Sequence, residues 1–264
     1  MEKQYELKFH DELHIQQEEQ LQIVIQSRAK GDLMIFLGEK AKNVSLQLIV
    51  QDSANAKIFV QNKAKQEVKF SVQAEIKENA NCVMAILDLE QTPMELQQKV
   101  NLAQQGANFE LFTAQLCGDK AHKASDIEIL HQTSNTTGIM HNYAVLFNEA
   151  YYEMVANGNI EKNCAQAQSH QETRVLTLGK DFKTKVIPLL LIDENDVKAS
   201  HALTIGQPDE NQLYYLQSRG LTTQQAMGLL SVGYFMPVIQ LIENEELREK
   251  LEEEMERRVG IYGN

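Results

Sequence analysis

The sequence has no tryptophan, only four prolines and only three cysteines among its 264 residues. So few prolines exclude collagen-like and proline-rich linker architectures. The three cysteines, Cys82, Cys117 and Cys164, form no Cys-x-x-Cys pair and are too few for a disulfide framework or a four-thiolate metal site. We therefore expect a reducing, cytoplasmic compartment.

Positive charge and long apolar runs are also scarce. Lys and Arg number 25 against 37 Asp and Glu, which gives a net charge of −12 and argues against nucleic acid or an anionic membrane as a partner. The densest apolar run, Val186–Ile192, is too short to cross a bilayer, and the amino-terminal residues lack a signal-peptide pattern. With 43% hydrophobic and 23% charged residues, the composition is that of a folded protein.

Short apolar runs rich in β-branched residues recur every 10 to 13 residues from about Leu21 to Ile192. Several alternate, as in Val68–Val72, where apolar side chains fall on one face and polar ones on the other. No helical pattern intervenes, so the sequence predicts an all-β body. The runs are 21–25, 33–37, 44–50, 57–60, 68–76, 82–89, 109–116, 127–131, 143–147, 151–155, 174–178 and 186–192.

A longer period is superimposed on the strands. Five asparagines recur at intervals of 26 to 28 residues: Asn55, Asn81, Asn108, Asn135 and Asn163. Asn tolerates left-handed backbone angles and therefore suits a sharp corner. A repeat of this size with two strands per period favours one coil of a β-solenoid, in which like corners stack. A β-sandwich remains the alternative, although it gives less reason for constant intervals.

After Pro208 and Asp209 the pattern becomes helical. Asp209 suits the start of a first helix, and Gly220 suits its end. Thr222 and Gln225 spell a capping box for a second helix, which Pro237 is expected to kink or end near Phe235. A third helix is expected to start at Asn244, with an apolar face of Leu247, Leu251, Met255 and Val259 and a stop at Gly260. We predict a β domain over 1–206 and a small helical domain over 207–264.

Motifs for phosphate binding, dinucleotide binding and nucleophilic serine chemistry are absent from the sequence. The residue that stands out is His201, at the junction of the last strand and the helices. A neutral imidazole there can bind iron or zinc or carry a proton, and it can equally cap the end of the β stack through a hydrogen bond.

At this junction the sequence resembles a known family. Residues 188–192 read PLLLI, residues 195–207 read NDVKASHALTIGQ, and residues 209–220 read DENQLYYLQSRG. They are similar to the SufB/SufD family pattern P-x-L-E-I-x-x-D-D-V-K-x-S-H-G-A-T-V-G, followed by D-E-x-Q-L-F-Y-L-x-S-R-G. The similarity is strong from about Gly106 to Ile242.

The resemblance implies a right-handed parallel β-helix with a C-terminal helical domain that docks on a SufC-like ABC ATPase. It implies a non-enzymatic scaffold of the SUF iron–sulfur cluster assembly system that pairs with a SufB-like chain or with itself. His201 then matches a histidine at the pairing seam, where it is a candidate ligand for iron or a transiently held cluster. Whether a flavin takes part stays open.

Departures from the family pattern point to the SufD branch, in a short form. SufB-type members carry a cysteine shortly before the final strand, whereas residues 178–183 here read LGKDFK. Leu191 stands in place of the family's Glu, Asn195 in place of the first Asp, and Ala202-Leu203 in place of Gly-Ala.

The helical domain supplies residue types that are enriched at interface centres, and four of them are the expected contacts with the ATPase: Tyr214, Tyr215, Arg219 and Phe235. Two other functions are compatible with the sequence: an interaction protein that binds the ATPase without metal, and the homodimeric scaffold of a minimal SUF system. A carbohydrate-active β-helix enzyme is disfavoured because no carboxylate cluster is evident along one face.

Overall fold

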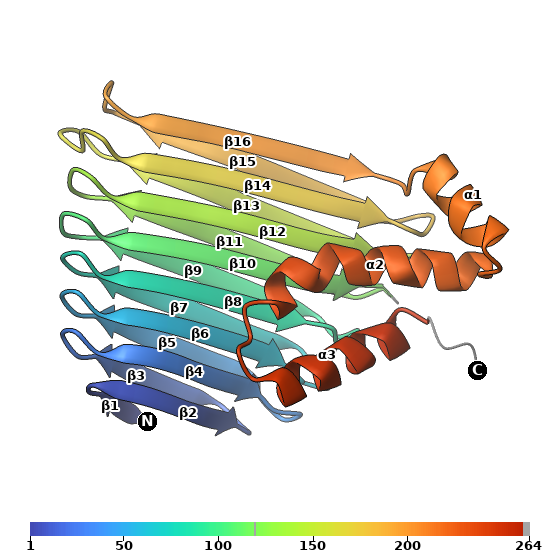
Figure 1. Ribbon diagram of the computed structural model, residues 1–264, viewed down its shortest axis with the longest axis horizontal. Coiled ribbons are helices and arrows are strands. Elements are labelled where there is room, and N and C mark those ends of the chain that lie inside the picture. Colours follow the sequence, from blue (N-terminus) through green and yellow to red (C-terminus); the bar gives the residue numbers. More distant parts are fainter. Residues whose placement is uncertain (119, 261–264) are drawn as a thin grey trace.

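The computed structural model describes residues 1–118 and 120–260 and shows a parallel β-helix with three helices after its last strand (Figure 1). Odd-numbered strands form one eight-stranded sheet and even-numbered strands the other, and strands of each sheet pair in parallel with the strand two positions along the chain. The odd sheet contains β1 (Glu2–Tyr5), β3 (Glu19–Ile25), β5 (Asn43–Val50), β7 (Val68–Ile76), β9 (Met94–Leu102), β11 (His122–His131), β13 (Tyr151–Ile160) and β15 (Lys183–Ile192). The even sheet contains β2 (Lys8–Ile15), β4 (Lys30–Leu37), β6 (Asn55–Asn62), β8 (Asn81–Asp88), β10 (Asn108–Cys117), β12 (Thr137–Leu146), β14 (Gln168–Thr177) and β16 (Lys198–Gly206). The predicted solenoid is confirmed.

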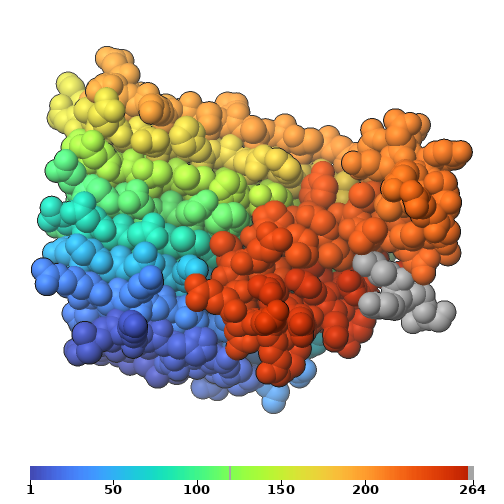
Figure 2. Space-filling view, viewed as in Figure 1, coloured from blue at the N-terminus to red at the C-terminus, as the bar shows by residue number. Residues whose placement is uncertain are grey.

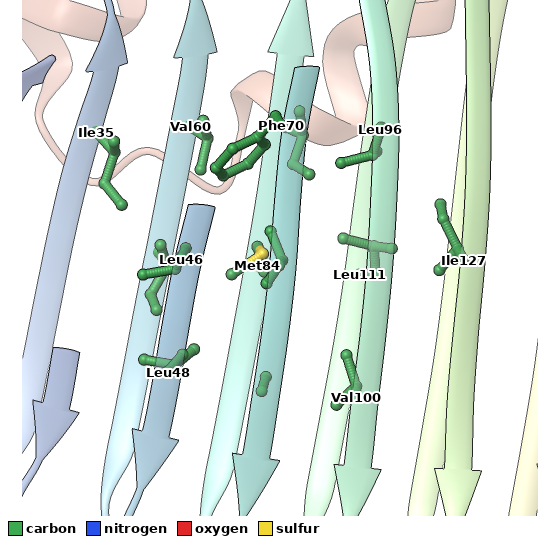
Figure 3. Packing of buried hydrophobic residues seen from close by; sticks show 14 of the residues in the cluster. Ile35, Leu46, Leu48, Val60, Phe70, Met84, Leu96, Val100, Leu111 and Ile127 are labelled. Carbon is green, nitrogen blue, oxygen red and sulfur yellow. The ribbon is translucent and has the colours of Figure 1, made fainter. Parts of the chain in front are cut away.

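Alternation along each strand sends every second side chain into the space between the sheets, which we call the lumen. In β7, Val68, Phe70, Val72, Ala74 and Ile76 all lie inward and have almost no exposed surface. Figure 3 shows how such side chains from successive coils stack and meet across the lumen, from Ile35 to Ile127. Burial of this apolar column is the main stabilisation that the sequence pattern encodes.

The corners between odd and even strands explain the asparagine period. Asn55, Asn81 and Asn108 stack in register, as the period predicts, but they are the first residues of their strands. The left-handed residues lie two positions earlier, at Ser53, Asn79 and Gly106. Only Asn135 and Asn163 of the five predicted corner asparagines have positive φ, at 57° and 68°. The repeat was therefore right, whereas the corner role holds for two asparagines of five.

All three helices begin where the sequence predicts, and the first and third also end where it predicts. Asp209 caps α1 (Glu210–Ser218) by accepting hydrogen bonds from the backbone N–H groups of Asn211 and Gln212. Thr222 and Gln225 form a capping box at the start of α2 (Thr223–Ile239), and Asn244 caps α3 (Glu245–Arg258). Pro237 does not end α2 near Phe235, because the helix continues to Ile239.

Helices α2 and α3 pack on the outer face of the even sheet, whereas α1 does not. Figure 1 shows α2 crossing in front of the even strands and α1 beyond the end of β16, and Figure 2 shows that the helices cover only part of this face. One apolar cluster joins Leu116 and Val145 of the sheet to Phe235 of α2 and Met255 of α3. Arg258 adds a two-pronged ion pair to Glu90, at 2.7 and 3.0 Å. Helix α1 has no buried residue.

None of the three described helices combines the length and the apolar character that a membrane span needs.

Candidate functional site at the C-terminal rim

The last coil of the solenoid, β15 with β16, presents an open rim. Each of these strands pairs with a neighbour on one side only, and no strand in the described residues covers the other side. Four large aliphatic side chains on the rim are more than a third exposed: Leu191, Ile192, Leu203 and Ile205. An exposed strand edge that is also apolar is a ready template for pairing with another chain.

Backbone hydrogen bonding shows which groups the rim leaves open. On the side of β13, the backbone N–H groups of Lys183 and Asp193 donate to the carbonyls of Ala150 and Ile160, at 2.7 and 2.9 Å. Odd-numbered residues of β15 therefore direct their N–H groups toward β13, and even-numbered residues direct theirs toward the open rim. Pro188 is an even residue, and its missing N–H falls on the open side, where a proline is tolerated. In β16, Lys198 donates to Ala167 at 3.0 Å, so the odd residues, including His201, turn their N–H groups to the rim without interruption.

His201 lies near the middle of this open strand. Its backbone is in register with Gln171 of β14, and its side chain is exposed. Its imidazole forms no hydrogen bond to another residue in the part of the chain that the structure describes. A capping bond within one chain is therefore not formed there, and the imidazole is available to a ligand or a second chain.

The cysteines offer no alternative ligand set. All three thiols are at most 1% exposed, in the lumen or at its corners. Burial raises the pKa of Cys82 to about 12 and that of Cys117 to about 11, which disfavours the thiolate that a metal requires. Across residues 1–118 and 120–260, no group of three or more His, Cys, Asp and Glu side chains is arranged to hold a metal ion. The described residues of one copy therefore offer His201 as an exposed imidazole without further metal-binding side chains grouped around it.

The predicted docking residues divide into two groups. Tyr214 and Tyr215 on α1 are 74% and 56% exposed, and the Arg219 guanidinium at the end of α1 lies 5.2 Å from the centre of the Tyr215 ring. The three side chains form an exposed surface at the end of the solenoid, which we call the α1 surface.

Phe235 is the exception and requires a correction. It is fully buried between α2 and the even sheet, in the cluster with Leu116 and Val145, because the apolar side of α2 faces the sheet. It supports the helix from inside and is not accessible to a partner.

Sequence reasoning missed the exposed aliphatic residues of the rim. The continuous apolar run Val186–Ile192 was the available signal, since a strand apolar on both faces is either covered on both sides or lies at an interface. The charged side chains near both ends of β15 were also missed.

Comparison with known proteins identifies the family to which the chain belongs. Residues 6–234 match the family described as SUF system FeS cluster assembly, SufBD core domain. The chain is 35% identical over 132 residues to the iron–sulfur cluster assembly protein SufD of Bacillus subtilis, a match that covers 50% of this chain and 30% of that protein. It is 28% identical over 99 residues to SufD of Escherichia coli, covering 37% of this chain and 23% of that protein.

A plant relative is also similar. Protein ABCI7, chloroplastic, of Arabidopsis thaliana is 33% identical over 100 residues, which cover 37% of this chain and 21% of that protein. The matched segments thus span less than a third of each of these relatives. Because the family match covers most of the residues, and SufD proteins are among the relatives, the chain belongs to the SufB/SufD family, in its SufD-like branch.

Proposed function

We propose that this chain is a SufD-like, non-enzymatic scaffold component of SUF iron–sulfur cluster assembly. In this proposal the C-terminal rim pairs with a second β-helix, and the α1 surface docks a SufC-like ABC ATPase. The observation that carries the proposal is the open, apolar rim with an exposed histidine in its middle. The names of the relatives support the assignment to cluster assembly.

The rim suits a shared metal site for a physical reason. Pairing along β16 satisfies its open N–H and C=O groups and removes the aliphatic side chains from water. His201 then lies inside the seam, where a thiolate or carboxylate of the other chain can complete a ligand set for iron or a nascent cluster. The cluster is the cargo of this scaffold, and His201 holds it transiently.

The α1 surface suits docking because nothing in the described part of the chain covers it. Two exposed tyrosines lie on one short helix and an arginine caps its end, and these residue types dominate binding energy at interface centres. Replacement of Tyr215 by Ala should weaken ATPase binding by about 2 kcal/mol or more. A pull-down and a titration calorimetry measurement with the purified ATPase test this, with Tyr234→Ala on the neighbouring helix as the comparison.

Anaerobic reconstitution with iron and sulfide tests the role of the rim. Wild type and His201→Ala are each mixed with the ATPase and a SufB-like chain, and cluster uptake is followed by absorbance and iron content. We expect His201→Ala to lose most of the cluster, whereas His10→Ala, at an exposed histidine near the opposite end of the solenoid, should retain it. Equal uptake by wild type and His201→Ala would contradict the proposed ligand.

A further inference from the structure

The side chain next to His201 in the lumen belongs to Gln171 of β14. The two residues are in register in the parallel pair of β14 and β16, so both side chains point to the same face, and neighbouring strands lie about 4.8 Å apart. Gln171 points inward together with Ser169 and Thr173, and each of the three has at most 4% of its surface exposed. His201 is therefore an inward-pointing residue, exposed because no further coil of the described chain covers it.

Gln171 uses one end of its amide to cross the lumen. Its Nε2 atom donates to the carbonyl oxygen of Leu189 on β15 at 2.6 Å. A carbonyl oxygen accepts hydrogen bonds and does not donate them, so this contact fixes which end of the amide is nitrogen and which is oxygen. The side chain is thus held between the two sheets, and the orientation of the amide beneath the rim is defined.

The other end of the amide is buried without a donor. The Oε1 atom of Gln171 has almost no exposed surface, and no donor in residues 1–118 or 120–260 forms a hydrogen bond with it. A buried acceptor in this state destabilises the folded chain, and such groups are rare in native proteins. The unpaired oxygen indicates that a donor joins it in another state of the rim.

The amide lies where it does because β13 contributes a glycine at this level. A Cβ atom at position 158 would lie 2.2 Å from Ser169 Oγ and 3.1 Å from Gln171 Nε2. A larger residue in place of Gly158 would therefore displace the side chains that lie beneath the rim. The layer next to His201 is polar, and the local packing leaves it room.

We propose that Gln171 is a positioning residue for His201, and that its Oε1 atom accepts a hydrogen bond from one ring nitrogen of the imidazole when the rim is covered. This inference rests on the rim site proposed above and deepens it. In the single chain the imidazole is exposed to water. When a second chain covers the rim, the imidazole N–H loses water and needs an acceptor, whereas the buried oxygen needs a donor. One hydrogen bond satisfies both groups.

The same bond decides which ring nitrogen is free. A neutral imidazole carries one N–H group and one lone pair, so donation to Gln171 leaves the lone pair on the other nitrogen. Histidines that bind metals commonly donate their other N–H group in this way, and the acceptor fixes both the tautomer and the orientation of the ring. Gln171 acts through His201 and does not itself contact the iron.

Three variants separate this role from a packing role. Gln171→Met keeps the length of the side chain and removes both amide groups, whereas Gln171→Glu keeps an acceptor oxygen. Ser169→Ala is the matched control, because Ser169 Oγ is also buried without a partner among the described residues, but it is in register with Ala199 and not with His201. Gln171→Asn keeps an amide of shorter reach, and it replaces Gln171→Met if that variant does not fold.

Each variant is assembled with the ATPase and a SufB-like chain, loaded anaerobically with iron and sulfide, and compared with wild type and His201→Ala. Circular dichroism and thermal unfolding verify that each variant is folded. Transfer of iron to a chelator measures how firmly the cluster is held. Electron spin echo spectroscopy of the reduced cluster, with ¹⁵N-histidine in this chain alone, detects a bound imidazole nitrogen, and His201→Ala identifies its signal.

We expect Gln171→Met to release iron about tenfold faster than wild type, or more, and to weaken the imidazole nitrogen signal. Gln171→Glu should recover both measures, and Ser169→Ala should leave them as in wild type. Wild-type iron release with an unchanged nitrogen signal in Gln171→Met would overturn the inference. Failure of Gln171→Glu to recover them, or an equal effect of Ser169→Ala, would also overturn it.

Failure of this inference is distinguishable from failure of the proposed function. If His201→Ala holds the cluster as firmly as wild type, His201 is not a ligand, and the proposed role of the rim fails together with the inference. If His201→Ala loses the cluster but Gln171→Met does not, the ligand stands and the positioning role of Gln171 fails.

Discussion

The lumen of this solenoid changes character along its axis. From β3 to β8 nearly every inward side chain is aliphatic or aromatic, and the polar exceptions, Asn62 and Asp88, lie at the ends of their strands. From β9 to β14 polar side chains enter the same columns, including Gln98, Lys123 and Asn142. The two halves share one backbone geometry but are stabilised differently.

The early half, from β3 to β8, is stabilised by apolar packing, so truncation of an inward side chain there costs the energy of a cavity. The later half, from β9 to β14, depends on hydrogen bonds between buried groups. Removal of one partner there costs the energy of an unpaired polar atom or charge. Thr113 donates to Asn142 at 2.9 Å, and Asn142 donates to Thr173 at 3.3 Å. These hydrogen bonds connect side chains of three successive coils. The comparison therefore predicts effects of different kind and size in the two halves.

The largest effect is expected at the buried ion pair of Lys123 and Asp88, whose side chains have no exposed surface. Lys123→Met should lower the free energy of unfolding by about 4 kcal/mol, because it leaves the Asp88 carboxyl buried without its partner. Adding Asp88→Asn should recover part of this loss, as measured by guanidinium unfolding. An equal loss in the single and the double variant would show that the pair does not act as a unit.

A cavity in the early half comes next. Leu48→Ala removes a side chain that is 1% exposed and should lower the free energy of unfolding by about 3 kcal/mol. The control is Leu7→Ala, at a leucine that is 82% exposed, where the change should stay within about 0.5 kcal/mol. Similar losses for both leucines would contradict the packing of the early lumen.

The third effect depends on pH. Burial lowers the pKa of His131 from 6.5 to about 4, and its Nδ1 atom lies 2.8 Å from Thr136 Oγ1. His131 of the unfolded chain binds a proton near pH 6.5, whereas His131 of the folded chain does so only near pH 4. The contribution of His131 to the free energy of unfolding is therefore fully present above pH 6.5 and is lost as the pH falls towards 4. We expect His131 to account for a loss of about 2 kcal/mol between pH 7 and pH 5.

Unfolding of wild type and His131→Gln at both pH values measures this loss. The variant should be less sensitive to acid by that amount. If the two proteins lose the same stability between pH 7 and pH 5, the histidine is not held neutral in the lumen.

The smallest effect is expected in the hydrogen-bonded chain. Thr113→Val keeps the volume of the side chain but removes the donor to Asn142, and it should cost about 1 kcal/mol by thermal or denaturant unfolding. A higher free energy of unfolding for Thr113→Val than for wild type would mean that apolar packing, and not hydrogen bonding, stabilises this part of the lumen.

Local pattern was sufficient to predict most of the fold. Alternation placed the strands, the 26- to 28-residue period indicated the coils, and Asp209, Thr222 and Asn244 marked the three helix starts. Strand β9 was missed because Gln97, Gln98 and Lys99 interrupt its apolar alternation, although Gln98 is buried in the lumen. Strands β1 and β2 were missed because they are short or rich in charge. Strand β16 was also absent from the predicted series of apolar runs, so His201 lies within the last strand and not after it.

The site was only partly predictable, because a single sequence does not say which surface covers which. An aromatic residue on an amphipathic helix faces either its own sheet or a partner, and the packing of α2 decided this for Phe235. His201 and the α1 residues are predictions that rest on residue type, on their place in the chain and on the family resemblance, and the structure shows that their side chains are exposed. The rim itself needed the structure, because exposure of Leu203 and Ile205 follows from the absence of a further strand beside β16 among the described residues.

Helix α1 lies between two firmly held elements. Gln207, Pro208 and Asp209 are all that separate it from β16, and its other end leads through Gly220 to α2, which is packed on the even sheet. A mechanical load on α1 would therefore reach the strand that carries His201 through three residues. Because the connection is so short, a change in the position of α1 requires a matching change in β16 or in these three residues.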